Sequence, residues 1–365
     1  MHTPRYVPPD FSAEHLKQAP TARTVAAERD GVLPDNFFAT TNLPTYIKGA
    51  DGLWTMPREP RMDGVLVLDA AGTWWVREGR RVRKGDAVVV GRAEDGSEGV
   101  LVHSHGFQVD DGAHGDFHFM SSQVSREKPI DYKQIARMLV EEKRRGGYTL
   151  WVTGPALVHS RARDNLVWFI RNGYVQALLA GNAVAVHDIE AAIVGTTLGM
   201  TSEGEQSEGG HAAHMRAINA VRRAGSIAQA VRDGLITDGI MHACVVEDVP
   251  FVLAGSLRDD GPLPDVLTDM VAAQDATRAH TKRATMAVMI ATALHSIAVG
   301  NMLPAYYEHP DRGVSELPTI CVDASEFLVS KLKDRGTHQA VGVVTNAQDF
   351  MSILKGAVER EVQGA

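Results

Sequence analysis

The sequence predicts an α/β fold, in which a mostly parallel sheet carries helices on both faces and a small β-rich domain precedes it. The chain has 365 residues, more than a single hydrophobic core usually supports, so we expect two domains. Short strand-like runs fill residues 37–119, and strand and helix patterns alternate from about residue 131 onward. Such alternation is typical of a parallel sheet with crossover helices.

The first 120 residues divide into an irregular lead-in and a β-rich domain. Residues 1–32 contain several prolines and show no sustained periodicity. Residues 33–120 contain short apolar runs that are separated by Gly and Asp turns, a pattern that predicts strands joined by tight connections. The strand candidates are residues 64–69, 74–76 and 87–91.

Residues 121–365 form the predicted α/β domain. Residues 131–145 predict an amphipathic helix with Ile135, Met138 and Leu139 on one face, and Gly146-Gly147 ends it. The strands that follow are apolar on both faces, as expected for a sheet buried on both sides. The strand candidates are residues 149–152, 175–180, 249–254, 286–290, 319–322 and 340–344, and the main helical patterns are 211–232 and 265–280.

Composition excludes several classes of protein. The formal net charge of −8 and the pI near 6.0 leave no basic surface for nucleic acid or anionic lipid. No apolar run reaches transmembrane length, so no membrane association is expected. The two cysteines, Cys244 and Cys321, lie in apolar runs; they exclude a disulfide framework and a cysteine-rich zinc site. We therefore expect a soluble cytoplasmic protein without a bound metal.

Small or polar residues follow most of the predicted strands. Carboxyl ends of parallel strands meet at one edge of the sheet, where free backbone amides suit a pyrophosphate. Any single Gly, Ser or Asn there is also explained as an ordinary turn residue, but several in one domain favour a nucleotide-type ligand. The predicted nucleotide contacts are Gly181, Asn182, Gly255, Ser256, Asn301 and Thr345.

Asp323 directly follows the predicted hydrophobic strand 319–322 and is the residue that most specifically indicates a bound nucleotide. A carboxylate at this place accepts hydrogen bonds from the two hydroxyls of an adenosine ribose, which selects NAD over NADP. An equally valid interpretation is a helix N-cap for a segment that starts near Ser325. The chain contains no Gly-x-Gly at all, so any dinucleotide is held by a non-standard arrangement.

Two clusters are candidates for acid–base chemistry. His211 and His214 open a helical pattern with Arg216 close behind, which suits a proton shuttle and a substrate carboxylate; a helix with exposed polar residues is the alternative. Asp260, with Arg258 in the same loop, follows a very apolar strand, where a desolvated carboxylate would accept a proton from an ammonium group. A solvated turn is the alternative there.

Longer motifs carry a family resemblance. They are residues 119–129, 179–182 (LAGN), 187–190 (HDIE), 210–219, 223–227, 249–256, 258–265 (RDDGPLPD), 295–301 (HSIAVGN) and 339–345. In these motifs the chain resembles the archaeal-type ornithine cyclodeaminase family, which is also the C-terminal module of cyanobacterial bifunctional arginine dihydrolase/ornithine cyclodeaminase enzymes. Its N-terminal part resembles the LOR/SDH-type conserved region that precedes that module, so the resemblance covers about residues 33–354.

The resemblance implies bound NAD and conversion of ornithine to proline with loss of ammonia. It also implies a Rossmann-like NAD domain similar to that of deoxyhypusine synthases, which bind NAD without a Gly-x-Gly-x-x-Gly loop. With an amino-acid substrate, we expect Asp260 to act as the base, with His211 as second choice, and Arg216 or Arg258 to hold the carboxylate. A homo-oligomer is expected, because such enzymes are usually oligomeric.

Two departures from the family pattern keep alternatives open. Where relatives tend to have His-Thr-Gly-Gly, this chain has His159 followed by Ser160, Arg161, Ala162 and Arg163, and two bulky cations there would change a pocket. Residues 306–316 resemble an insertion. The alternatives are an NAD-dependent deaminase or dehydrogenase that does not cyclise its product, a cyclodeaminase for another diamino acid, and a non-catalytic sensor of NAD or an amino acid.

Overall fold

The computed structural model describes residues 5–108, 130–200, 212–259, 261–304, 306–309, 313–335 and 340–364. Contacts divide the chain into two compact units. The first contains Met1–Lys128, Asn301–Leu317 and Thr337–Gln339, and the second contains Pro129–Gly300, Pro318–Gly336 and Ala340–Ala365. The chain therefore returns to the first unit after most of the second has been built.

A seven-stranded parallel sheet forms the centre of the second unit and confirms the predicted fold class. The strand order is β13-β12-β11-β10-β14-β17-β18, so the chain adds strands outward from β10 to β13 and then reverses, placing β14 on the other side of β10. The strands are β10 (Thr149–Thr153), β11 (Ala177–Gly181), β12 (Phe251–Ala254), β13 (Val266–Leu267), β14 (Met286–Ile290), β17 (Thr319–Asp323) and β18 (Ala340–Val344).

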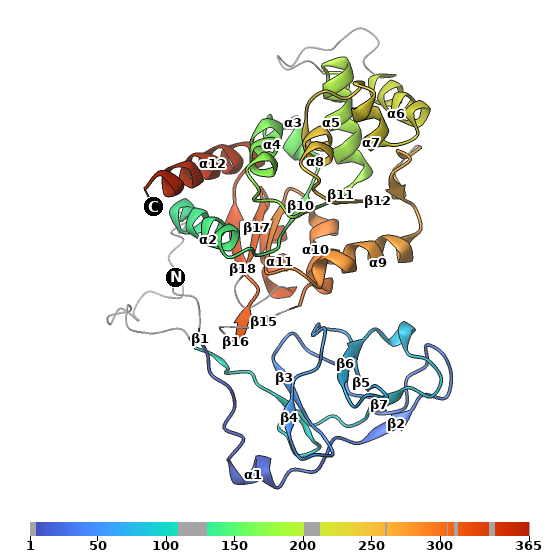
Figure 1. Cartoon of the computed structure of the whole chain (residues 1–365), viewed down its shortest axis with the longest axis vertical. Helices are drawn as coiled ribbons and strands as arrows, with labels where there is room; N and C mark the ends of the chain where they lie inside the picture. The colour runs from blue at the N-terminus through green and yellow to red at the C-terminus, as the bar shows by residue number, and fades with distance from the viewer. Residues whose placement is uncertain are drawn as a thin grey trace. The chain divides into compact units, whose positions relative to one another are not determined.

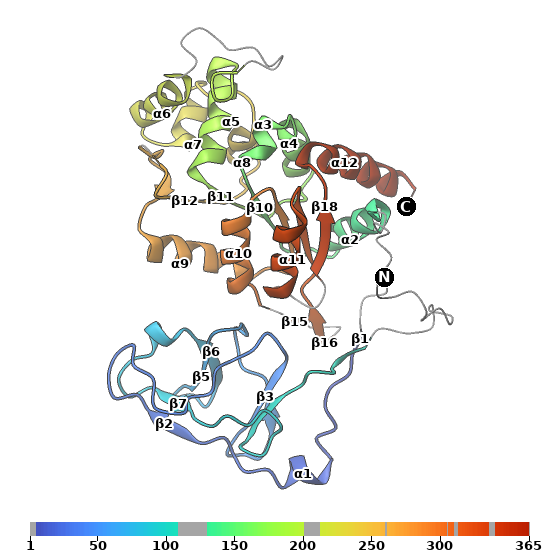
Figure 2. The same cartoon turned by 180° about the vertical axis from the view of Figure 1, so that it is seen from behind.

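Helices cover both faces of this sheet (Figures 1 and 2). Right-handed crossovers place connections made before and after the reversal on opposite faces. One face carries α2 (Tyr132–Arg144), α3 (Ala156–His159), α4 (Arg163–Arg171), α5 (Asn182–Val194), α6 (Ala213–Ala224), α7 (Ile227–Arg232), α8 (Ile240–Val246) and α12 (Ala347–Gln363). The other carries α9 (Met270–Thr281), α10 (Ala293–Met302) and α11 (Glu326–Arg335), which lie in front of the sheet in Figure 2.

Two helix predictions were wrong in their boundaries. The pattern over residues 211–232 continues through Gly225, but Gly225 adopts a left-handed φ of 95° and ends α6, and the Ser226 side chain accepts a hydrogen bond from the Gln229 amide to start α7. The pattern over 265–280 begins too early, because its first residues form the short edge strand β13. Asp269 then caps α9 through the Ala272 amide.

The first unit consists of small antiparallel sheets. Its four-stranded sheet has the order β2-β7-β5-β6 and its three-stranded sheet the order β4-β3-β8, with β1-β9 and β15-β16 as two-stranded pairs. The three strands predicted here are confirmed as β5, β6 and β7. The elements are β1 (Arg5–Tyr6), α1 (Glu14–Lys17), β2 (Thr24–Ala26), β3 (Thr45–Lys48), β4 (Trp54–Thr55), β5 (Val65–Leu68), β6 (Trp74–Arg77), η1 (Gly79–Arg81), β7 (Ala87–Val89), β8 (Val100–Val102), β9 (Phe107–Gln108), β15 (Tyr306–His309) and β16 (Gly313–Glu316).

Two further features bear on the class of protein. Over the part of the chain that the structure describes, no helix combines the length and apolar character needed to cross a membrane. Cys244 and Cys321 are both buried and unbridged, and burial raises the pKa of the Cys244 thiol above its usual range. Cys244 therefore remains a protonated core side chain.

Candidate functional site

The carboxyl edge of the parallel sheet gathers the strand ends that the sequence singled out. In register, Thr153 lies beside Ala180 and Ile290, Gly181 lies beside Ala254, and Asp323 lies beside Val344. The reversal of strand order falls between β10 and β14. In open α/β sheets, ligands bind at the carboxyl ends of the strands beside such a reversal.

Gly154 lies at this reversal, in contact with the end of β14. Its amide donates to the Ile290 carbonyl over 2.9 Å, and a Cβ added here would lie 1.8 Å from the Ala291 oxygen. Ala291 itself has a left-handed φ of 55°, which is uncommon for a residue with a Cβ. Only glycine fits position 154, so the two central strand ends approach more closely than side chains would permit.

Two buried hydroxyls near the reversal lack hydrogen-bond partners among the described residues. They are Thr153 Oγ1, at the end of β10, and Ser296 Oγ, in the first turn of α10. Both residues are about 99% buried, and a buried polar group without a partner is costly. Next to Ser296, burial lowers the pKa of His295 to about 4, so this imidazole is neutral at neutral pH. None of these three residues is among the contacts predicted from the sequence, although His295 and Ser296 lie in the 295–301 motif.

The predicted contacts after β11 and β12 lie in one loop system. Gly181 caps α5 with an extended backbone, and a Cβ there would lie 3.8 Å from the Ala254 carbonyl oxygen, so the fold itself has room for a side chain. Asn182 is buried, and its side-chain oxygen accepts from the Leu263 amide over 3.1 Å. The Gly255 amide donates to the Leu267 carbonyl, and the Ser256 amide donates to the Asp259 carboxylate over 2.7 Å. Asn182 therefore holds the loop that carries Gly255 and Ser256.

Asp323 and Thr345 form a second group beyond β14. The Thr345 amide donates to the Asp323 carbonyl over 3.0 Å. One carboxylate oxygen of Asp323 accepts from the Ser325 amide over 2.9 Å, which closes the turn before α11. This turn agrees with the alternative interpretation of Asp323 as a residue that starts the following helix. The interpretation of Asp323 as a ribose ligand, through its other carboxylate oxygen, stays a prediction.

The remaining predicted residues are exposed, lie in the first unit or lie outside the described residues. Arg216 is exposed on α6, and Arg258 is exposed in the loop after β12. Asn301 lies in the last turn of α10 and belongs to the first unit, and its buried side-chain oxygen has no partner among the described residues. Asp260 and His211, the two candidate bases, lie outside the described residues, so their roles stay predictions.

A row of titratable side chains joins α3 and α5, which lie side by side (Figures 1 and 2). The His159 and His187 rings are 4.5 Å apart between centroids, and His187 Nδ1 lies 3.4 Å from Glu190 Oε2. The fully buried Glu190 carboxylate also accepts from Thr196 Oγ1, Leu198 N and Gly199 N at 2.9–3.1 Å.

Hydrogen bonds lower the pKa of Glu190, whereas burial and the neighbouring His187 lower that of His159. Burial acts to raise the pKa of Glu190, but the bonds from His187, Gly199, Thr196 and Leu198 hold it below its usual value. Partial burial and the neighbouring His187 lower the pKa of His159, which Glu190 opposes. Glu190 is thus ionised and His159 is neutral at neutral pH. The HDIE motif contains His187 and Glu190 and could be noticed in the sequence. The contact between His187 and His159 could not, because it depends on how α3 and α5 pack.

Arg163, one of the two cations after His159, is held in ion pairs within the fold. Its Nε lies 2.6 Å from Asp188, and its Nη2 lies 2.8 Å from Asp238. Asp188 is fully buried and also accepts from the amides of Ile240 and Met241. This network joins α4, α5 and α8, so Arg163 stabilises the fold.

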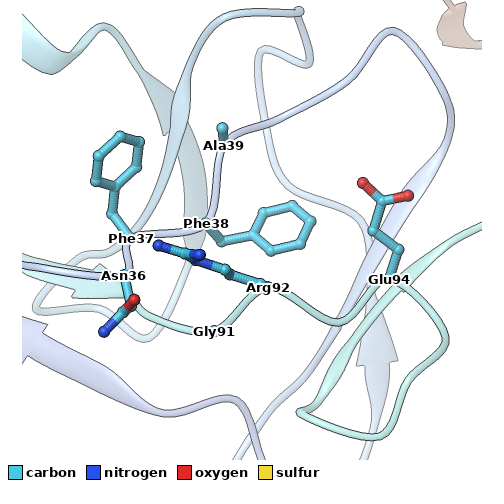
Figure 3. Close-up of a pocket in the computed structure, with 7 residues that line it drawn as sticks. All are labelled: Asn36, Phe37, Phe38, Ala39, Gly91, Arg92 and Glu94. Carbon is cyan, nitrogen blue, oxygen red and sulfur yellow. The ribbon is translucent and has the colours of Figure 1, made fainter.

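A hollow of about 330 Å³ lies in the first unit (Figure 3). Figure 3 shows Arg92 extended beside Phe38, with Glu94 turned away from it. None of the predicted site residues lines this hollow, so it is not the predicted nucleotide site. The lining residues are Asn36, Phe37, Phe38, Ala39, Gly91, Arg92 and Glu94.

Most of the sequence matches two regions of one known protein family. Residues 133–354 match the Rossmann-fold C-terminal region of arginine dihydrolase ArgZ-like proteins, and residues 44–133 match the first region of that C-terminal part. The ornithine cyclodeaminase of Methanopyrus kandleri is 45% identical over 343 residues, which cover 93% of this chain and 78% of that protein. The chain belongs to the ornithine cyclodeaminase family. The resemblance seen in the sequence motifs is thereby confirmed.

Solved structures of relatives agree with this family. A conserved LOR/SDH protein from Methanococcus maripaludis is 40% identical and gives a TM-score of 0.83, covering 94% of this chain and 99% of that one. AgrE of Nostoc sp., a bifunctional arginine dihydrolase/ornithine cyclodeaminase, is 38% identical, and the match spans 46% of its length. Its solved ternary complex with ornithine and NAD+ gives a TM-score of 0.60, covering 95% of this chain and 47% of that chain.

The sheet edge of this cyclodeaminase-family chain fits a bound NAD. Gly154 permits a close approach of backbone at the reversal, and the unpaired hydroxyls of Thr153 and Ser296 would gain partners from a polar ligand. Gly255 and Asp323 lie on either side of these central strands. An extended dinucleotide would thus find polar groups on both sides of the reversal.

Proposed function

We propose that this protein is an NAD-dependent ornithine cyclodeaminase that converts L-ornithine to L-proline and ammonia. The observation that carries the proposal is the AgrE complex with ornithine and NAD+, whose match covers 95% of this chain at 35% identity. Archaeal proteins named ornithine cyclodeaminase, at 40–45% identity, support the same reaction. Proline biosynthesis is the corresponding role.

We propose that NAD lies along the carboxyl edge of the seven-stranded sheet. When bound, it supplies hydride abstraction from the α-carbon and hydride return to the cyclised product, so the cycle is redox-neutral. The chain holds and orients the cofactor and excludes water. The residues proposed to hold it are Gly181, Asn182, Gly255, Ser256, Asp323 and Thr345 from the sequence, together with Thr153, Gly154 and Ser296 from the structure. Asn301 lies in the last turn of α10, at the end of the helix that points away from this edge, and belongs to the first unit, so it is not included.

In this proposal Asn182 positions a loop of the NAD site through its side chain. Its side-chain oxygen binds the Leu263 amide, so it shapes the loop in which Gly255 and Ser256 present their backbone. One Asp323 carboxylate oxygen accepts from the Ser325 amide, and we propose that the other accepts from a ribose hydroxyl. Arg216 and Arg258, both exposed, remain the proposed partners of the substrate carboxylate, and Asp260 and His211 remain the proposed bases.

The test is an assay of the full chain with NAD and L-ornithine. We expect proline and ammonia in equal amounts by mass spectrometry, with no net NADH by absorbance, because the hydride returns to the product. Net NADH with a linear keto or imino product would support the non-cyclising dehydrogenase or deaminase instead. Bound NAD without any product would support a sensor or another diamino acid, which a panel of diamino acids would separate.

Assembly and location complete the proposal. We propose a homo-oligomer that works in the cytoplasm, where NAD is abundant and buried free thiols such as Cys244 and Cys321 stay reduced. Light scattering coupled to size exclusion measures the mass of the assembly. A mass near 39.5 kDa, that of one chain, would contradict the oligomer.

A further inference from the structure

The row His159–His187–Glu190 runs from a buried carboxylate to an exposed imidazole. Glu190 is 0% exposed, the His187 side chain is 11% exposed, and His159 is exposed. The row joins α3, which follows the central strand β10, to α5, which follows β11. Because α3 contains only four residues, a rise of about 6 Å, His159 stays close to the carboxyl edge of the sheet.

We propose that His159 exchanges protons with the amino groups of the substrate and that His187 and Glu190 are its positioning residues. This inference rests on the proposed function, because it assigns a proton acceptor to the same reaction. The Glu190 carboxylate accepts from His187 and orients that ring, and the His187 ring packs against the His159 ring, so each group is positioned by the one behind it.

The reaction requires such a group. Both amines of ornithine are protonated at neutral pH, and the α-nitrogen must lose a proton to His159 before it forms a C=N bond as hydride leaves. The side-chain ammonium releases one proton to solvent, and its nitrogen forms a bond to the α-carbon as the C=N electron pair moves back to the α-nitrogen. The bond from the α-carbon to the α-nitrogen then breaks: this nitrogen takes the proton that His159 returns and leaves as ammonia, while the ring nitrogen loses one proton to solvent and forms a C=N bond to the α-carbon. Hydride returns to that carbon, and ammonia and the ring nitrogen each take up one proton, so ornithine becomes proline and ammonium with no net change in charge or oxidation state.

The surroundings of His159 suit this role. Its neutral state, caused by partial burial and His187, leaves a ring nitrogen free to accept a proton. On α4, Arg163 is committed to Asp188 and Asp238, and on α12 Lys355 pairs with Glu359. Among the described residues, His187 and Glu190 are the charged or titratable groups that act on the His159 pKa. The other charged residues on helices in contact with α3 are Asp164, Arg171, Asp349, Arg360 and Glu361.

The first experiment is His159→Gln in the full chain, with His105→Gln as the matched control. His105 is an exposed loop histidine of the first unit. We expect His159→Gln to lower kcat about 10²- to 10⁴-fold, the usual contribution of a general base, with NAD affinity unchanged, and His105→Gln to keep wild-type kcat. Proline formation by His159→Gln within threefold of wild type would overturn the proposal.

The positioning residues are tested by opposite pH shifts. His187 lowers the His159 pKa and Glu190 raises it, so His187→Gln moves the acid limb of kcat/KM to higher pH, and Glu190→Gln moves it to lower pH. NMR titration of the His159 ring, assigned by its loss in His159→Gln, must show the same two shifts. A merely structural role would lower activity in both variants without opposite shifts, and that result would overturn the positioning roles.

Folding and function failures are separable in this design. Glu190→Gln removes part of the anchor for residues 196–199, so circular dichroism and NAD affinity verify its fold, and His187→Gln carries the test if that fold is lost. A wild-type chain that forms no proline contradicts the proposed function, and the substrate role of His159 is lost with it. A wild-type chain that forms proline beside an equally active His159→Gln contradicts this inference alone.

Discussion

At the residue scale, two glycines at the carboxyl edge of the sheet differ in the space that surrounds them. Gly154 has no space for a side chain, because a Cβ would lie 1.8 Å from a backbone oxygen, whereas Gly181 has an ordinary backbone and 3.8 Å of clearance. The first glycine is thus required by the fold. If Gly181 matters, it matters through a ligand, since the fold tolerates a side chain there.

The pair gives a prediction that separates folding from cofactor binding. We expect Gly154→Ala to destabilise the chain by about 1–3 kcal/mol, because backbone must move to admit the methyl group. Gly181→Ala should keep the wild-type free energy of unfolding and weaken NAD binding. Urea denaturation and calorimetric titration with NAD measure both quantities. Unchanged NAD affinity in a folded Gly181→Ala variant would remove Gly181 from the site.

Glu316 predicts a pH-dependent stability. Burial raises its pKa from 4.5 to about 7, and Oε2 has no hydrogen-bond partner among the described residues. The folded chain therefore binds this proton more tightly than the unfolded chain. The stabilisation is fully present below about pH 4.5 and is lost as the pH rises through about 7.

Glu316→Gln keeps the shape of the protonated acid and cannot ionise. Relative to wild type, we expect it to be more stable by roughly 3 kcal/mol above pH 7 and nearly equal near pH 4.5, since each pKa unit corresponds to about 1.4 kcal/mol. Urea denaturation at several pH values measures the difference. A difference that does not vary with pH would show that Glu316 is not the titrating group.

At the element scale, one buried ion pair organises three helices. Arg163 at the start of α4 binds Asp188 of α5 and Asp238 before α8, and Gly239 leaves room for it, since a Cβ there would lie 2.1 Å from Arg163 Nη2. The Asp188 carboxylate meanwhile binds the first amides of α8. The cation after His159 that looked foreign to the family pattern is therefore part of the packing.

Removing this cation should destabilise the fold strongly. We expect Arg163→Ala to lower the free energy of unfolding by about 3–5 kcal/mol, because Asp188 is left charged and buried. The control is Arg83→Ala, whose partner Asp30 is exposed and whose loss should cost about 1 kcal/mol or less. Equal losses in both variants, measured by urea denaturation, would contradict the structural role.

At the scale of the whole molecule, the two units are interleaved along the chain. Residues Asn301–Leu317 belong to the first unit although they follow α10. The β15–β16 hairpin buries Tyr306 and Glu316, which are 2% and 3% exposed, and it contacts β1. The segment that resembled an insertion is thus a component of the first unit.

Deletion of residues 1–129 should therefore harm the remaining fragment. We expect it to bind a hydrophobic dye and to self-associate, because the inward face of the β15–β16 hairpin loses its cover. Dye fluorescence and light scattering, compared with the full chain, measure both effects. A fragment with the dye binding and melting temperature of the full chain would show that the first unit is dispensable for folding.

Sequence alone determined the fold class, six of the seven parallel strands and the family. These follow from local pattern, because strands buried on both faces are continuously apolar and the motifs are contiguous. The break at Gly225 and the strand β13 escaped prediction because both depend on how short segments pack.

Only the tertiary structure decided which residues meet. Strand order placed Gly154 against Ala291, and helix packing brought His159 to His187 and Arg163 to Asp188. None of these pairs is close in sequence, so no periodicity could reveal them. Local patterns record what each element must bury, whereas a site is set by contacts between elements, and those contacts exist only once the chain has folded.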